Sequence, residues 1–294
     1  MNEPIPVKQM KKILEQQFKV IWEAAFGIVE SGDLQIGNFT VKKDNKEEIA
    51  KLKALIKVME AEVQQYRDEC YTNFSVEMMD LMQEDLSAFK NEIFAKKLWT
   101  VHSALTDMSN KELDRYRESF DDATAKEVYE YTQSILDNTR DYVTKVFPKI
   151  NLKTVNSISD LKLDFLSEED MLMSGVIGLG IRSELMHRLY PGIFPIMTRR
   201  TLWGMYFLTG EGEFVVDENY DGKSRTSHQW NYEYDRLCFY SNFLMNIMES
   251  YLAKHNIKIK PEYRFGYINL MLVEYAKKHN VEINKLYTWK YSGL

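Results

Sequence analysis

Residues 7–29 read VKQMKKILEQQFKVIWEAAFGIV, and their apolar side chains recur at intervals of three and four. This spacing places one apolar stripe along a helix, which is buried by packing against other elements. Stretches of the same kind follow at about 45–70, 75–105 and 109–146. Because short polar links join them, they predict an antiparallel bundle of long helices over residues 1–150.

The second half of the chain has shorter segments. Phe147-Pro148 and the polar run after it mark a domain boundary near 148–160. Beyond it, helical patterns occur at about 167–174, 180–190, 199–208, 232–254, 262–279 and 283–290. Alternating residues at 34–41 and 214–216 predict short β-elements. The predicted fold is therefore all-α for most of its length, with a compact helical domain with a minor β-element over residues 151–294.

Composition narrows the class of protein. The 294 residues are 45% hydrophobic and 28% charged, which is typical of globular chains. The net charge of −6 arises within residues 1–150, which hold 21 Lys and Arg against 27 Asp and Glu; residues 151–294 hold 17 of each. This balance argues against a surface that binds nucleic acid all over, but it leaves room for a local basic patch.

Cysteine usage and hydropathy predict where the chain works. Cys70 and Cys238 fall in separate helical patterns and provide neither a disulfide framework nor a thiolate metal site. The N-terminal residues lack an apolar signal core, and no apolar run is long enough for a membrane span. We therefore expect a cytoplasmic protein without membrane contact.

Residues 175–209 carry the most specific chemistry, GVIGLGIRSELMHRLYPGIFPIMTRRTLWGMYFLT. Gly178 and Gly180 form a Gly-x-Gly turn that leads into a helix. The third glycine of a dinucleotide fingerprint and the Gly-Lys-Ser/Thr of a P-loop are both missing. Two interpretations remain: a plain turn between packed helices, or exposed amides that hold a phosphate.

Four arginines lie in this stretch, at Arg182, Arg188, Arg199 and Arg200. Guanidinium groups suit phosphates and carboxylates, so the arginines could bind nucleic acid or another phosphate. They could equally form salt bridges with the acidic first half of the chain, or remain solvated at the surface.

The Gly-x-Gly turn, the His-x-Leu-Tyr-Pro ending of the next helix and the Phe-Pro-Ile before an arginine-bearing helix resemble the helix–hairpin–helix DNA glycosylase superfamily. The resemblance covers about residues 175–205. It implies that Gly178, Gly180 and Arg182 contact DNA backbone phosphate. Thr198 stands where the catalytic aspartate of that superfamily is expected, so the resemblance implies binding without glycosylase chemistry.

Glu184 and His187 form a Glu-x-x-His step, the spacing that presents two metal ligands on one helix face. A di-iron site needs a second such step and two further glutamates, and no other histidine follows a glutamate at this distance. No metal or cofactor is therefore predicted. An enzyme remains an alternative, with His187, Glu184, Tyr190 and His228 as candidates in a pocket between helices 180–208 and loop 210–230.

The leading hypothesis is a non-enzymatic binding or regulatory protein of bacterial type. Arg182, Arg199 and Arg200, with the amides near Gly178 and Gly180, would contact a phosphate-bearing ligand such as a nucleic acid. The N-terminal bundle would associate with itself or with a protein partner. A further alternative is a structural subunit of a bacterial assembly or defence system.

Overall fold

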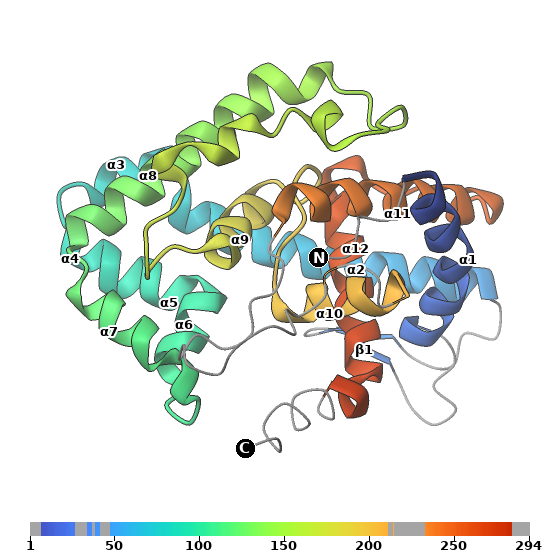
Figure 1. Ribbon diagram of the computed structural model, residues 1–294, viewed down its shortest axis with the longest axis horizontal. Coiled ribbons are helices and arrows are strands. Elements are labelled where there is room, and N and C mark those ends of the chain that lie inside the picture. Colours follow the sequence, from blue (N-terminus) through green and yellow to red (C-terminus); the bar gives the residue numbers. More distant parts are fainter. Residues whose placement is uncertain are drawn as a thin grey trace.

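The computed structural model describes residues 7–26, 34–36, 39–41, 48–210, 214 and 233–283. Within these ranges the protein is predominantly α-helical, with helices α1 to α12 and one two-stranded hairpin (Figure 1). The predicted all-α class is therefore confirmed. None of the helices described is long and apolar enough to cross a membrane.

The first two helices follow the predicted pattern. α1 spans Val7–Phe26 and α2 spans Glu48–Phe74. Between them, β1 (Leu34–Ile36) and β2 (Phe39–Val41) pair in antiparallel register, with Leu34 opposite Val41. The short β-element predicted over residues 34–41 is therefore present, as two paired strands.

Residues 75–146 differ from the prediction of two long helices. The chain instead forms α3 (Val76–Met82), α4 (Leu86–Ala88), α5 (Ala95–Lys97), α6 (Trp99–Thr106), α7 (Asp114–Asp122) and α8 (Ala125–Asp141), with π-helical turns at Phe89–Phe94 and Tyr142–Val146. Leu98 is extended, which ends α5, and Ala123 is extended before the capping box of Thr124 and Glu127 that starts α8. The apolar spacing continues across these breaks, so periodicity alone does not reveal them.

The second half matches the predicted helices more closely. α9 spans Leu179–Leu189, α10 Arg199–Leu208, α11 Tyr234–Lys254 and α12 Arg264–Lys278. The expected helix at 167–174 is replaced by 3-10 turns at Asp164–Ser167 and Glu169–Met171. Of the β-element expected at 214–216, only Phe214 lies within the described residues, and the helix expected at 283–290 falls outside them except for Ile283.

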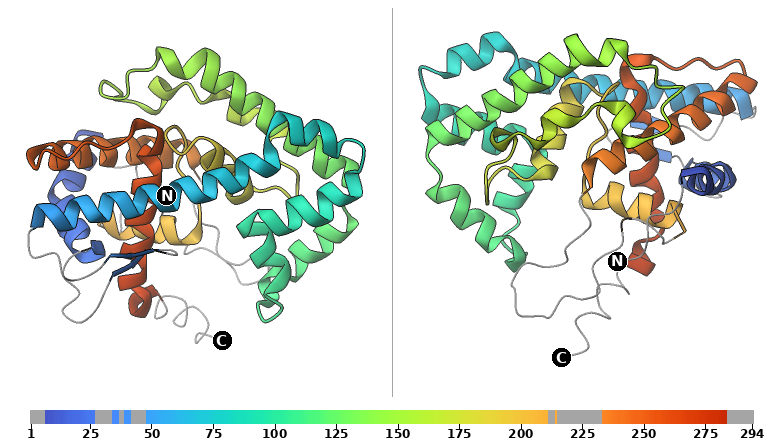
Figure 2. Two further views of the ribbon diagram at one scale, coloured as in Figure 1. Left: turned by 180° about the vertical axis from the view of Figure 1, so that it is seen from behind. Right: turned by 45° about the horizontal axis from the view of Figure 1, so that its top comes forward.

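α12 lies at the centre of one end of the molecule, in contact with α1, α2, α10 and α11. Seen from behind, α2 crosses in front of α12, and α3 to α8 gather at the other end of α2 (Figure 2). α10 and α12 pack closely because Gly204 has no side chain: a Cβ there would lie 2.7 Å from the Leu272 carbonyl oxygen. Helices from both halves of the chain thus share one apolar core, and the domain division near residue 150 stays a prediction.

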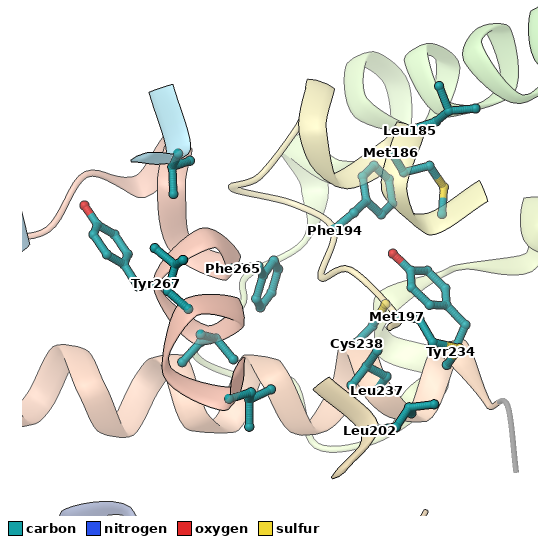
Figure 3. Close-up of a cluster of buried hydrophobic side chains, with 14 of the residues drawn as sticks. Leu185, Met186, Phe194, Met197, Leu202, Tyr234, Leu237, Cys238, Phe265 and Tyr267 are labelled. Carbon is teal, nitrogen blue, oxygen red and sulfur yellow. The ribbon is translucent and has the colours of Figure 1, made fainter. Parts of the chain in front are cut away.

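The segment between α9 and α10 is anchored in this core. Phe194 and Met197 are fully or almost fully buried. The Phe194 ring lies beside Met186 of α9, and Met197 lies with Cys238 and Tyr234 of α11 (Figure 3). The Tyr234 hydroxyl donates to the Pro195 carbonyl oxygen at 2.7 Å. These contacts fix where α9 ends and where α10 begins.

Candidate phosphate-binding surface

α9 carries three of the candidate polar residues on sides that face the interior. Arg182, Glu184 and His187 are 3%, 0% and 1% exposed. A buried polar group is expected to have a partner inside the protein, and a buried charge even more so. The partners of each side chain therefore decide what that residue can do.

Glu184 closes the start of another helix. Its carboxylate accepts hydrogen bonds from the backbone N–H groups of Trp99 at 2.7 Å and Thr100 at 2.9 Å, the first two residues of α6. Leu98, at the N-cap of α6, makes no side-chain cap. Glu184 also binds the Arg188 Nε at 2.9 Å. It therefore acts as a remote helix cap with its own counterion.

His187 is a neutral interior side chain. Its Nδ1 lies 2.7 Å from the Phe194 carbonyl oxygen, an acceptor, so Nδ1 carries the proton. Nε2 faces the Tyr66 hydroxyl at 3.4 Å. Burial lowers the pKa of His187 to about 4, against a weaker opposing effect of the Phe194 hydrogen bond. The imidazole thus links the segment that follows α9 to α9 itself by a hydrogen bond.

Arg182 is buried without a carboxylate partner among the described residues. Its guanidinium donates to the Leu166 carbonyl oxygen at 2.8 Å and lies 5.9 Å from the centroid of the Tyr234 ring. Its Nε has no hydrogen-bond partner within the part of the chain that the structure describes. Burial lowers the pKa of Arg182. Because this side chain points inward, we leave it out of the phosphate-binding surface on which it was expected.

The structure describes three of the four residues expected for an enzyme, Glu184, His187 and Tyr190. Tyr190 lines an open pocket whose lining includes neither Glu184 nor His187, and His228 lies outside the described residues. Across the described ranges, no group of three or more His, Cys, Asp and Glu side chains could hold a metal ion.

The start of α9 is open to solvent at its glycine turn. Gly178 is the N-cap, is exposed and makes no side-chain cap. A Cβ at Gly178 would meet nothing within 4 Å, so neither strain nor close packing requires a glycine there. The first amides of a helix lack intrahelical acceptors, so this end of α9 can accept an anion.

The start of α10 lies beside it. A Cβ on Gly180 would lie 3.5 Å from the Met197 carbonyl oxygen, one residue before the Thr198 N-cap of α10. Arg199 and Arg200 are exposed in the first turn of α10, which contains no acidic residue. Cations at a helix N-terminus oppose the helix dipole, and a bound anion would relieve this repulsion. Arginine side chains and helix therefore favour negative charge at the same place.

A third helix start completes this surface and is not apparent from the sequence. A Cβ added to Gly180 would also lie 4.0 Å from the Thr100 side chain, at the beginning of α6. Trp99, the first residue of α6, is 55% exposed, and Lys97 is exposed just before it. We define the helix-start surface as Lys97, Trp99, Gly178, Gly180, Arg199 and Arg200. Only the tertiary fold brings residues from near 98 beside residues from near 180 and 199.

Thr198, at the position expected for a glycosylase aspartate, has a structural role in this chain. Its hydroxyl accepts a hydrogen bond from the Thr201 N–H at 3.2 Å and caps α10. The resemblance to helix–hairpin–helix DNA glycosylases stays a prediction. No protein-family model, curated protein or solved structure matches this chain.

Proposed function

We propose that the protein binds the phosphate backbone of a nucleic acid through the helix-start surface and acts as a binding or regulatory protein. One observation carries this proposal: two exposed arginines occupy the first turn of a helix whose start adjoins the uncapped start of α9. Arginine forks and helix N-termini are both recurrent partners of phosphate.

Trp99 supports a nucleic acid over a free phosphate. An exposed indole beside cationic side chains gives a face on which an unpaired base can stack, whereas a simple phosphate gains nothing from it. The combination of stacking and charge favours a single strand.

The local charge supports the proposal despite the overall net charge of −6. Glu184 is the acidic residue of α9, and its charge is already neutralised by Arg188 and by the amides of α6. It therefore offers little repulsion to an anion approaching Arg199 and Arg200.

The test is the affinity of a fluorescent single-stranded oligonucleotide, measured by anisotropy over a series of salt concentrations. We expect Arg199→Ala/Arg200→Ala to weaken binding at low salt. The slope of the logarithm of the binding constant against the logarithm of the salt concentration should fall in magnitude by roughly two, one for each lost phosphate contact. Lys254→Ala/Lys258→Ala is the matched control, because it removes two exposed cations at and just after the C-terminal end of α11, whose position is seen in Figure 1.

Trp99→Ala separates stacking from charge. We expect it to weaken single-strand binding by about tenfold while leaving the salt slope unchanged, because a stacked base contributes roughly 1–3 kcal/mol without releasing counterions. Equal affinities for the parent protein and the Arg199/Arg200 variant at every salt concentration would contradict the proposed function.

A further inference from the structure

A second site lies where three loops meet beside α2. An open pocket of about 480 Å³ is formed by the turn after α8, the Tyr190–Ile193 loop after α9 and the start of α12. This volume falls in the range of small-molecule sites. None of the residues of the helix-start surface lines the pocket.

Interior hydrogen bonds hold the first wall of this pocket. The Leu152 carbonyl oxygen accepts from the side-chain amides of Asn242 at 2.9 Å and Asn246 at 3.1 Å, both on α11. Two donors on one carbonyl fix the turn that carries Ile150 and Lys153. This wall therefore exists before any ligand arrives.

The opposite wall is fixed by close backbone contact. The Phe265 N–H donates to the Pro191 carbonyl oxygen at 2.8 Å. A Cβ at Gly192 would lie 2.6 Å from the Pro261 carbonyl oxygen, so only glycine allows this approach. Pre-formed walls reduce the ordering cost of binding.

The lining combines apolar and cationic side chains. Phe147, Ile150, Leu152, Leu189 and Ile193 provide aliphatic and aromatic surface. The charged groups are Arg67, Lys153 and Arg264, with Glu262 as the one acid among the lining residues.

These charges leave one positive charge without compensation. Arg264 is 8% exposed and is neutralised by Glu249, which binds its guanidinium. Arg67 and Lys153 then share the lining with the single carboxylate of Glu262. Arg67, which is partly buried on α2, forms no ion pair with any residue that the structure describes.

From this charge and shape we infer that the pocket binds an amphipathic monocarboxylate, with the apolar body between Ile150, Leu189 and Ile193 and the carboxylate on Arg67. A planar guanidinium matches a carboxylate in a two-point contact. The apolar lining recognises the rest of the ligand by burial.

The experiment follows the methyl resonances of Ile150, Leu152, Leu189 and Ile193 while the protein is titrated with octanoate, octanol or octylammonium. We expect saturable shifts with octanoate and weaker binding of octanol, which lacks the charge. Arg67→Ala should weaken octanoate binding by about tenfold or more, as for the loss of a charge-assisted contact. Arg115→Ala, which removes an exposed arginine of α7 outside the lining, is the matched control.

A charge reversal sharpens the test. Arg67→Glu should abolish octanoate binding and gain octylammonium binding, because Arg67 is partly exposed and its replacement leaves the fixed walls in place. Equal affinities for octanoate and octanol, no effect of Arg67→Ala beyond that of Arg115→Ala, or no saturable octanoate shift would each overturn the inference.

Discussion

α9 and α10 come from one stretch of sequence and carry similar residues, yet they use them in opposite ways. On α9, Arg182, Glu184 and His187 are buried and bind groups inside the protein. On α10, Arg199 and Arg200 lie exposed in the first turn. Polar residue type alone therefore does not indicate a binding site, because the side of the helix that faces the core decides its role.

The largest effect on stability is expected from a substitution that removes the buried contacts of Glu184 on α9. Glu184→Gln leaves Arg188 largely buried without a counterion and weakens the cap of α6, so we expect a loss of about 3–5 kcal/mol in the free energy of unfolding. Urea unfolding measures it. Glu118→Gln, an exposed acid of α7, is the control and should change the free energy by less than about 0.5 kcal/mol. A similar small loss for Glu184→Gln would mean that its contacts are not structural.

His187 gives the next largest effect, and it depends on pH. The folded pKa of about 4 lies below the unfolded value of 6.5, so the unfolded chain binds more protons between these values. The stability that the neutral imidazole contributes is present above pH 6.5 and is lost as the pH falls to 4. This loss is about 3 kcal/mol.

Comparison with His187→Gln isolates this contribution. The advantage of the parent over the variant in unfolding free energy should shrink by about 3 kcal/mol between pH 7 and pH 4. The exposed His102→Gln variant should show no such trend. If the parent and His187→Gln respond to pH in parallel, His187 does not sit neutral in the interior.

Arg182 should have the smallest effect on stability. It is almost as buried as Glu184, but among the described residues its partner is one carbonyl oxygen and no carboxylate, so its desolvation is poorly compensated. We expect Arg182→Met to lower the free energy of unfolding by no more than about 1 kcal/mol, or to raise it. A loss as large as that of Glu184→Gln would show that the buried cation is essential to the fold.

The sequence predicted the α-helical class and the later helices well because apolar spacing is a local signal. α10 has the predicted bounds, and α11 and α12 begin within two residues of them. The breaks at Leu98 and Ala123 were missed, because an apolar stripe can continue through an extended residue. Of the site, Arg199 and Arg200 were identified from residue type, whereas Trp99 was not.

The reason lies in long-range packing. The contact that brings α6 to α9 is made by Glu184 with two backbone amides about 85 positions earlier. Backbone amides have no sequence signature, so neither this cap nor the exposure of Trp99 could be predicted. The same limit explains Arg182, whose burial depends on Tyr234 and Leu166 rather than on its neighbours in the chain.

The most direct test of the central claim compares Arg182→Met with Arg199→Ala/Arg200→Ala in oligonucleotide binding across a salt series. If the exposed start of α10 binds phosphate and the interior of α9 does not, only the α10 variant will lose affinity and salt slope. Arg182→Met will bind as the parent does. Loss of binding in Arg182→Met with an intact fold, or parental binding in the α10 variant, would contradict the account.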